Sequence, residues 1–327
     1  MIEKLIILED VDPVVFYGVR NVNLQMIKSL YPKLRIVARD NVIKILGDEE
    51  LVAHFEECIM RLQEHCVTYN TLTEEVILDV VKGKGEWSVK GKGKKDDKVI
   101  CYSVTGKPIK ARSDNQQLLV DAFEKDDMIF ATGPAGTGKT YTSIALAVKA
   151  LKEKRIRKVI LSRPAVEAGE KLGFLPGDMK DKIDPYLQPL YDALEDMIPA
   201  VKLQEMLEKH IIQIAPLAFM RGRTLSDAVV ILDEAQNTTV AQIKMFLTRM
   251  GSNTKMIITG DCTQIDLPRS VRSGLLQALE VLNGVKGISF VEMTQKDIVR
   301  HKLVTRIVEA YDRYNNRIKE EEKEDAE

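Results

Sequence analysis

Cysteine and tryptophan are scarce in this chain of 327 residues, which holds only four cysteines and one tryptophan. The cysteines are scattered, with neither a CxxC pair nor the spacing of a metal site, and this favours reduced thiols over a disulfide framework. Acidic residues soon interrupt the short apolar run at Leu5–Leu8, so the N-terminus does not look like a signal peptide. No apolar stretch approaches the roughly 20 residues that span a bilayer. We therefore expect a cytoplasmic protein without membrane contacts.

An excess of charge of either sign is also missing. Charged residues make up 30% of the chain, yet the formal net charge is −1, so the balance neither requires nor excludes a nucleic-acid partner. Hydrophobic residues reach 45%, which is enough apolar surface to form a core. The length predicts about two domains.

The first 81 residues have a pattern of their own. Apolar residues such as Leu51, Phe55 and Leu62 recur with helical spacing, whereas other segments have the composition of short strands. The pattern predicts strands at Leu5–Leu8, Leu34–Val37 and Val42–Leu46, and helices at Asn21–Leu30, Glu49–His65 and Thr73–Val81. Residues 1–81 are therefore expected to form a small α+β domain.

Residues 82–101 differ in composition from the segments on either side. The stretch KGKGEWSVKGKGKKDDK is rich in lysine and glycine and has little to bury, which predicts a flexible basic linker. Trp87 could stack on a nucleic-acid base, but a solvated tether without a partner is the plainer interpretation. A second charge-rich stretch, at residues 316–327, is expected to be a frayed tail.

Residues 102–315 alternate apolar strands with helical patterns, which predicts an α/β domain with a parallel sheet covered by helices on both faces. The expected strands are Met128–Ala131, Lys158–Ser162, Ile211–Ala215, Ala228–Leu232, Lys255–Thr259 and Ile288–Met293. The expected helices are Thr140–Lys152, Val240–Met250, Gly274–Leu282 and Ile298–Tyr314.

A phosphate-binding motif follows the first of these strands. The pattern GxxxxGK[ST] is met by Gly133, Pro134, Ala135, Gly136, Thr137, Gly138, Lys139 and Thr140. Glycines let the backbone bend around phosphates, while the lysine reaches the β and γ oxygens and the threonine hydroxyl binds Mg²⁺. The helix that follows points the positive end of its dipole at the anion. The sequence therefore predicts a nucleotide site with ATP and Mg²⁺ as its ligands.

Acidic residues stand at the end of two later strands. The aliphatic run at 229–232 is followed by Asp233, which can hold Mg²⁺, and by Glu234, which is placed to orient and deprotonate an attacking water. The run at 256–259 ends in Gly260-Asp261, with Gln264 just beyond. Gln264 could contact the γ-phosphate, although a polar turn is the plainer reading of that segment alone.

Several longer motifs resemble the bacterial PhoH family of ATPases. These are SRPAVEAGEKLGFLPGD, DPYLQPLYDAL, APLAFMRGRTL, ILDEAQNTT, KMFLTRMG and TGDCTQIDLP, and the resemblance spans about Gln116 to Tyr314. The family is similar to the first ATPase domain of superfamily 1 helicases, which implies a RecA-like core. Family members carry a KH-like N-terminal domain. No GxxG loop stands between the expected helices here, so direct RNA binding by that domain is doubtful and a packing or assembly role is equally open.

The resemblance also implies further site residues. Gln116, or alternatively Gln117, would read the adenine edge through two amide hydrogen bonds. Gln264 would couple the γ-phosphate to a nucleic-acid site. RNA could cross the edge of the sheet at Arg163–Asp178, although this segment could equally be an ordered lid or a subunit contact.

The missing second helicase domain would normally supply arginines that stabilise the transition state. We therefore expect a homo-oligomeric ring, perhaps a hexamer, in which one subunit completes its neighbour's site. Arg221 and Arg223 are the preferred candidates, with Arg249 and Arg300 as further ones, and binding of RNA phosphate or a local ion pair is the alternative role for the preferred pair.

Three functions remain open at this point. The resemblance implies an RNA-linked ATPase or helicase, with an endoribonuclease of ribosomal RNA maturation as an expected partner. A P-loop kinase is a second hypothesis, although Glu234 argues against it because an acid that activates water would waste ATP. A nucleotide-dependent regulatory switch that controls assembly is the third.

Overall fold

The computed structural model describes residues 1–9, 11–83, 99–164, 179–268 and 270–299, and four residues of the C-terminal segment, namely Leu303, Val304, Arg306 and Ile307. Side chains are described for all of these except residues 179–185. Most of the expected linker with Trp87, the segment 165–178, Arg300 and the charged tail lie outside the described residues. The helix expected at Ile298–Tyr314 also lies largely outside them.

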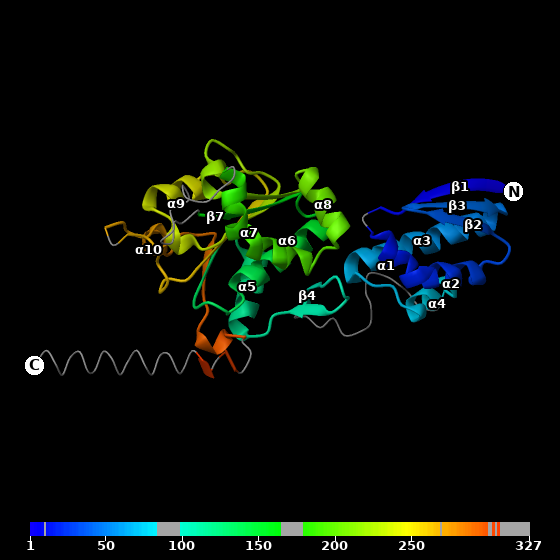
Figure 1. Cartoon of the computed structure of the whole chain (residues 1–327), viewed down its shortest axis with the longest axis horizontal. Coiled ribbons are helices and arrows are strands. Elements are labelled where there is room, and N and C mark those ends of the chain that lie inside the picture. Colours follow the sequence, from blue (N-terminus) through cyan, green and yellow to red (C-terminus); the bar gives the residue numbers. More distant parts are fainter. Residues whose placement is uncertain are drawn as a thin grey trace, which may run out of the picture.

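The N-terminal part is a three-stranded antiparallel sheet packed against helices (Figure 1). Its elements are β1 (Ile2–Ile7), α1 (Pro13–Tyr17), η1 (Val19–Asn21), α2 (Val22–Leu30), β2 (Arg35–Arg39), β3 (Val42–Gly47), α3 (Glu49–Tyr69) and α4 (Glu74–Val81). The strand order is β1-β3-β2. Phe16, Phe55 and Leu62 are fully buried in its core. The predicted small α+β unit is therefore confirmed, with β1 longer than expected and α1 an addition.

A short hairpin connects this part to the rest of the chain. Its strands are β4 (Val99–Tyr102) and β5 (Pro108–Lys110), so residues 99–101 are a strand where the composition predicted linker. At the end of α3, the side-chain nitrogen of Asn70 donates to the backbone carbonyls of Tyr102, Ser103 and Met197 at 3.0, 3.2 and 3.2 Å. Polar contacts thus tie the N-terminal part to the following domain.

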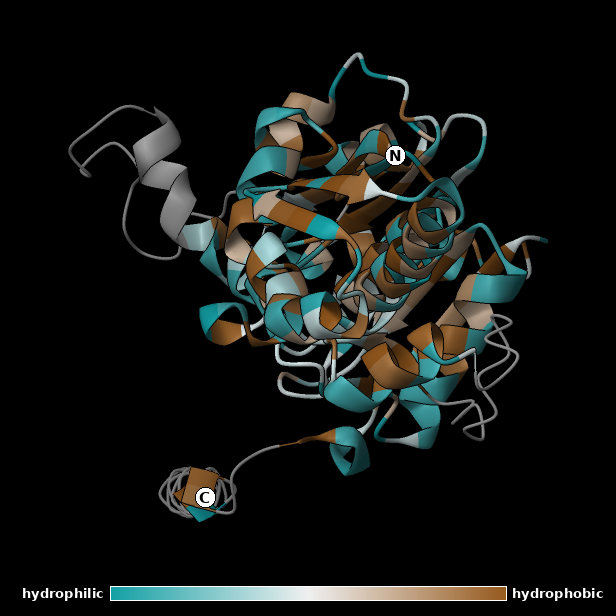
Figure 2. Cartoon of the chain, turned by 90° about the vertical axis from the view of Figure 1, so that its right-hand side faces the viewer, coloured by the Kyte–Doolittle hydropathy of each residue, from teal (hydrophilic) through white to brown (hydrophobic). Residues whose placement is uncertain are grey.

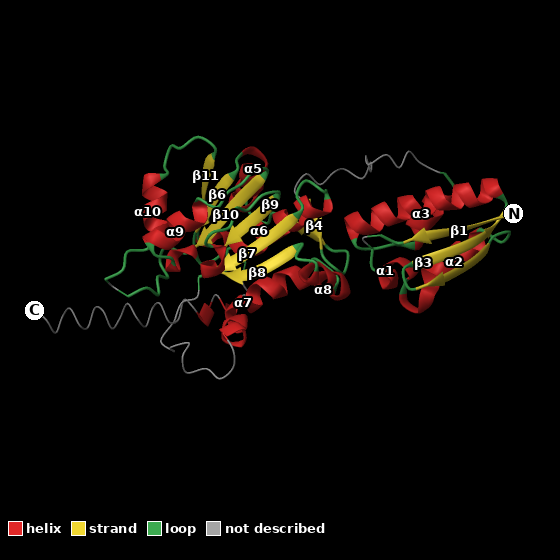
Figure 3. Ribbon diagram, turned by 90° about the horizontal axis from the view of Figure 1, so that it is seen from above, coloured by secondary structure: helices red, strands yellow, loops and turns green. Residues whose placement is uncertain are grey.

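The second part is a six-stranded parallel sheet with the order β11-β6-β10-β9-β7-β8 (Figure 3). Its strands are β6 (Met128–Thr132), β7 (Lys158–Arg163), β8 (Ile212–Pro216), β9 (Ala228–Leu232), β10 (Thr254–Gly260) and β11 (Ile288–Glu292). Its helices are α5 (Asp114–Lys125), α6 (Lys139–Lys152), α7 (Met179–Glu195), α8 (Ala200–Glu208), α9 (Val240–Leu247) and α10 (Gly274–Val281). All six strands were predicted to within one residue at each end, and the α/β class is confirmed.

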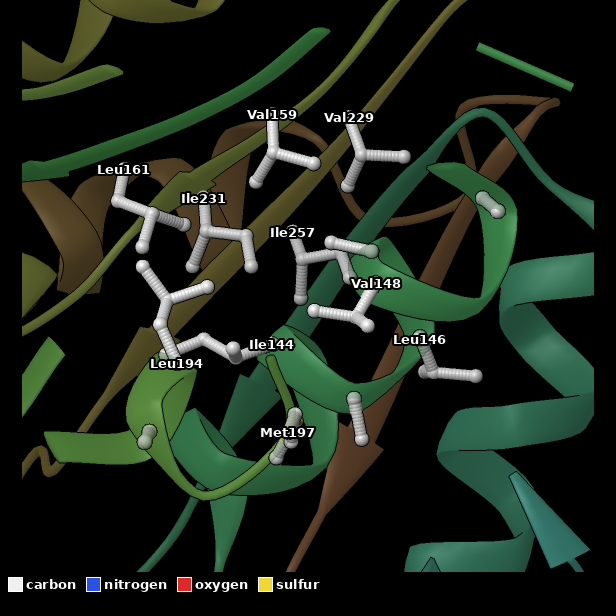
Figure 4. Packing of buried hydrophobic residues seen from close by; sticks show 14 of the residues in the cluster. Ile144, Leu146, Val148, Val159, Leu161, Leu194, Met197, Val229, Ile231 and Ile257 are labelled. Atoms are coloured by element: carbon white, nitrogen blue, oxygen red, sulfur yellow. The ribbon is translucent and has the colours of Figure 1, made fainter. Parts of the chain in front are cut away.

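Alternate residues of each central strand enter different cores, because successive side chains of a strand point to opposite faces. Val229 and Ile231 of β9 join a cluster under α5, α6, α7 and α8, whereas Val230 joins a second cluster under α9 and α10. Ile144 and Val148 of α6 pack on the first face, as Figure 4 shows. In Figure 2 the interior strands are mostly brown and the outer sides of the helices mostly teal. Burial on both faces explains why these strands read as continuous apolar runs.

Three helices of this domain were not predicted: α5, α7 and α8. The α7 sequence contains Pro185 and Pro189, which remove backbone donors and are unfavourable inside a helix. Its buried residues Leu187, Leu190 and Leu194 pack into the first core. Tertiary packing therefore outweighs a local preference that argues against a helix. Within the described part of the chain, no helix is both long and apolar enough to cross a membrane.

Candidate functional site

The phosphate loop joins β6, the strand next to the β11 edge of the sheet, to α6. β6 lies between β11 and β10, and the chain then crosses to β7 elsewhere in the sheet, so a crevice opens at the carboxyl ends of the strands. Gly133 has a φ of 142°, and a Cβ there would lie 2.2 Å from the carbonyl oxygen of Met293. Gly138 has a φ of 79° immediately before the first residue of α6. These two positions require glycine because the backbone both turns sharply and passes close to a neighbour.

Lys139, the first residue of α6, lies folded back into the loop. Its ammonium donates to the carbonyl oxygens of Gly133 and Pro134 at 2.6 and 2.8 Å, and the side chain is largely buried. Burial lowers the pKa of Lys139, and the charges of Asp261, Glu234 and Asp233 oppose that effect. The ammonium therefore lies near three acids, and its positive charge can pair with the negative charge of a bound phosphate.

Asp233 follows β9 and faces the start of α6. Its Oδ1 accepts hydrogen bonds from the hydroxyls of Thr140 at 2.6 Å and Thr259 at 2.7 Å, and the residue is 4% exposed. The pairing of β10 with both β6 and β9 brings these three residues together. A carboxylate beside a threonine hydroxyl is an oxygen donor set that suits Mg²⁺, which commonly takes one or two carboxylates and completes its shell with phosphates and waters.

Glu234 adopts a left-handed backbone conformation, with φ 53° and ψ 40°. Its Oε2 accepts from the side-chain amide of Gln236 at 2.6 Å, and its Oε1 lies 3.1 Å from Nη2 of Arg163. A non-glycine residue in this region is uncommon and is often found at functional sites. The two acids have different main partners, since Asp233 accepts from two threonine hydroxyls whereas Glu234 contacts Gln236 and Arg163.

The turn after β10 closes the site on the other side of the phosphate loop. Asp261 is buried, and its Oδ2 accepts from the backbone amide of Ala135 at 3.1 Å. The Gln236 amide that holds Glu234 also donates to the Gln264 carbonyl at 3.1 Å. Gln264 thus lines the same cavity, of about 260 Å³, as the phosphate loop and the two acids. The sequence placed Gln264 correctly near the site, but it gave no role to Asp261 or Gln236.

Gln116 lies directly against the phosphate loop. Its side-chain oxygen accepts from the Arg112 amide at 2.8 Å, and its side-chain nitrogen donates to the Thr137 carbonyl at 2.8 Å. Gln117 instead donates to Asp121 on α5 at 2.9 Å. Each Gln116 amide atom has capacity for a second hydrogen bond, so the adenine contact stays a prediction for Gln116.

The preferred arginines lie at the far edge of the sheet. Arg221 and Arg223 follow η3 (Leu217–Met220), just after β8, which is four strand spacings or about 19 Å from β6. Arg223 donates to the Gln213 side chain at 2.6 Å, and Arg249 donates to the carbonyls of Met245 and Arg223. Arg221 is exposed. None of these three is brought to the site of its own chain, and Arg221 has the exposure that a contact with another subunit requires.

A polar cluster beside the loop fixes the segment that follows β11. Asp297 Oδ2 accepts from the Asn115 side chain at 2.8 Å and from the Thr294 amide at 2.6 Å, and the Val299 amide donates to the Gly136 carbonyl at 3.1 Å. Burial alone would raise the pKa of Asp297, but hydrogen bonds from Asn115, Ser113 and Thr294 outweigh it and lower the pKa to about 2. The ionised form is therefore favoured in the folded chain.

Asp297 should make the stability of the chain depend on pH. Because its folded pKa lies below the ordinary value of 3.8, its contribution is complete above about pH 4 and is lost as pH falls towards 2. We expect Asp297→Asn to reduce the free energy of unfolding at pH 6, by a difference that shrinks as pH falls from about 4 towards 2. Urea unfolding across this range measures it, with Asp121→Asn as the control. A difference that is constant with pH would contradict the assignment.

Comparisons with known proteins agree with these motifs. The family model described as PhoH-like protein matches residues 108–312. A PhoH-like protein of Bacillus subtilis (strain 168) is 49% identical over 282 residues, covering 86% of this chain and 88% of that protein. Protein PhoH of Escherichia coli (strain K12) is 48% identical over 206 residues, covering 62% of this chain and 58% of that protein.

Similarity to solved structures is much weaker. The Pif1 helicase from Candida albicans is 15% identical, with a TM-score of 0.32, over 60% of this chain and 42% of that chain. A similarity this low shows nothing about the activity of this chain.

Proposed function

The chain belongs to the PhoH-like protein family, is a P-loop NTPase, and on this premise we propose that it hydrolyses ATP and couples hydrolysis to RNA binding or remodelling. The observation that carries the hydrolysis part of the proposal is the contact of the Asp233 carboxylate with the Thr140 hydroxyl, at 2.6 Å and at the end of the phosphate loop. The RNA part rests on the motifs that resemble superfamily 1 helicases. Two residues that are 93 positions apart in sequence are thereby in contact, and their oxygen atoms are placed where the metal ion of a bound nucleotide needs ligands.

Mg²⁺ fits the oxygen donors that meet at this point. Thr140 Oγ1 and Asp233 Oδ1 would hold the ion, which supplies charge neutralisation to the phosphates when bound. Among the described residues, no group of three or more histidine, cysteine or acidic side chains is placed to hold a metal by itself.

The other residues of the site have different roles in hydrolysis. Backbone amides of the phosphate loop and the Lys139 ammonium bind the phosphates and stabilise charge that develops on them. Glu234 orients the attacking water and accepts its proton. Gln264 and Gln236, joined through the Gln264 carbonyl, connect this acid to the turn after β10. In this assignment, Asp233 stays with the metal and Glu234 with the water.

RNA coupling is tested by measuring turnover with and without single-stranded RNA. We expect RNA to raise kcat for ATP several-fold, because a nucleic-acid site coupled to the γ-phosphate must favour the hydrolytic state. We also expect the RNA concentration needed for half-stimulation to rise with salt, since phosphate contacts release counterions. If no RNA or DNA of any length stimulates turnover, the coupling is wrong even if the ATPase activity is real.

A further inference from the structure

Arg163 is the last residue of β7, and each of its three guanidinium nitrogens contacts a neighbouring group. Nη2 lies 3.1 Å from Glu234 Oε1, and Nε lies 3.8 Å from Asp233 Oδ2. Nη1 donates to the backbone carbonyl of Tyr186 in α7 at 2.8 Å. The Arg163 side chain is 21% exposed, so these contacts are partly shielded from water. One planar group therefore joins both acids of the site to a helix on one face of the sheet.

The pairing of the strands explains why Arg163 reaches the acids. β7 and β9 are parallel neighbours with Ser162 opposite Leu232, so Arg163 and Asp233 leave the sheet at the same level. Helix α7 packs against β7 and β8, which brings the Tyr186 carbonyl to the same edge. The approach of Arg163 to Asp233 thus follows from the sheet order, and the turn after β9 then places Glu234 beside the same guanidinium group.

Glu234 is restrained on both sides. Arg163 occupies one carboxylate oxygen and the Gln236 amide, at 2.6 Å, occupies the other. Hydrogen bonds to ionised groups are stronger than neutral ones, and a guanidinium holds a carboxylate in a defined orientation. Each carboxylate oxygen can still accept a hydrogen bond from a water, but a change in the direction of the Glu234 side chain requires that one of these two contacts be given up.

We propose that Arg163 is a positioning residue that holds Glu234 in a resting orientation and makes its release depend on the position of α7. The proposal rests on the role of Glu234 in the proposed hydrolysis. Movement of α7 away from β7 withdraws the Tyr186 carbonyl, the guanidinium loses one of its three anchors, and Glu234 becomes free to orient water. A ligand that binds to α7 and moves it would then raise kcat and leave the affinity for nucleotide unchanged.

Kinetics of two substitutions test the restraint. Arg163→Ala should raise basal kcat by about three- to tenfold and leave KM for ATP within about twofold, because a restraint on the chemical step is removed and no phosphate contact is lost. Arg163→Lys should raise kcat less, since an ammonium still pairs with Glu234. A fall in kcat of either variant, or an unchanged kcat in Arg163→Ala, would overturn the proposal; the fall would mean that Arg163 supports catalysis and does not restrain it.

Hydrogen exchange of α7 tests the other half of the link. An ammonium cannot span Glu234 and Tyr186 as a planar fork does. Arg163→Lys and Arg163→Ala should therefore raise amide exchange at residues 186–191 to a similar extent. The control is Arg155→Ala, which removes an arginine whose ion pairs are with Glu124 and Glu153, away from the site. Unchanged exchange at residues 186–191 in both Arg163 variants would show that α7 is not coupled to the acid.

Failure of the hydrolysis role of Glu234 is recognised separately. Glu234→Gln tests that role directly, because it removes the acid itself together with its ion pair to Arg163. If Glu234→Gln turns over normally, the proposed function is wrong at its first step. If Glu234→Gln is inactive but Arg163→Ala behaves as wild type in both assays, hydrolysis stands and only the restraint is wrong.

Discussion

Replacement of Lys139 by alanine is expected to reduce ATP turnover at least about 100-fold, the loss typical when a charge-stabilising group is removed from a preorganised site. The ammonium is buried against the loop carbonyls and feels the charge of three acids, and Lys139 is the cationic side chain of the phosphate loop itself. Nucleotide affinity should fall as well, because the same charge acts in the ground state. Steady-state turnover and binding of a fluorescent ATP analogue measure the two effects.

Lys149→Ala is a matched control for this substitution. Lys149 lies on the same helix, α6, in its last turn and away from the phosphate loop. It should leave both affinity and turnover at wild-type levels. Wild-type affinity and turnover in Lys139→Ala would mean that the loop does not bind phosphate, and the nucleotide site would have to be sought elsewhere.

Glu234→Gln should abolish turnover while nucleotide stays bound. Glutamine has nearly the same shape as glutamate but cannot accept a proton from water, and removal of a general base typically costs about 10²- to 10⁴-fold in rate. Asp233 and Lys139 are untouched, so the affinity for ATP should change little. Single-turnover hydrolysis and analysis of the bound nucleotide after gel filtration would show ATP retained in place of ADP.

A surface acid provides the comparison for that result. Glu280 forms an exposed ion pair with Arg272 at 2.6 Å on α10, and Glu280→Gln should behave as wild type. Equal loss of binding and turnover in Glu234→Gln would indicate that Glu234 holds the metal or nucleotide and does not activate water. The separation of binding from turnover is therefore the decisive part of the experiment.

Much of the fold follows from local sequence. The strand Ala228–Leu232 is aliphatic throughout because both its faces are buried, and its boundaries are the predicted ones. Helix α7 was missed for the opposite reason, since Pro185 and Pro189 argue against a helix that burial of Leu187, Leu190 and Leu194 nevertheless stabilises. Contacts between residues far apart in sequence leave no such local pattern.

Only part of the site could be found in the same way. The side chain of Arg163 meets Glu234, 71 positions later, through neighbouring strands whose pairing no local motif specifies. From the sequence alone Arg163 belongs to a possible RNA path at Arg163–Asp178, because it begins the segment that follows the second strand. Gln236 was missed because an amide after an acidic pair is common in turns and has no distinctive spacing.

The sequence by itself determined the phosphate loop, because the glycines, Lys139 and Thr140 lie within eight consecutive residues and their chemistry depends on local backbone geometry. It also determined that Asp233 and Glu234 end a buried strand. Only the tertiary structure decided which groups these acids contact. Thr140, Thr259 and Arg163 reach them because β10 separates β6 from β9 and β7 lies on the other side of β9, and strand order in a parallel sheet is set by long-range packing.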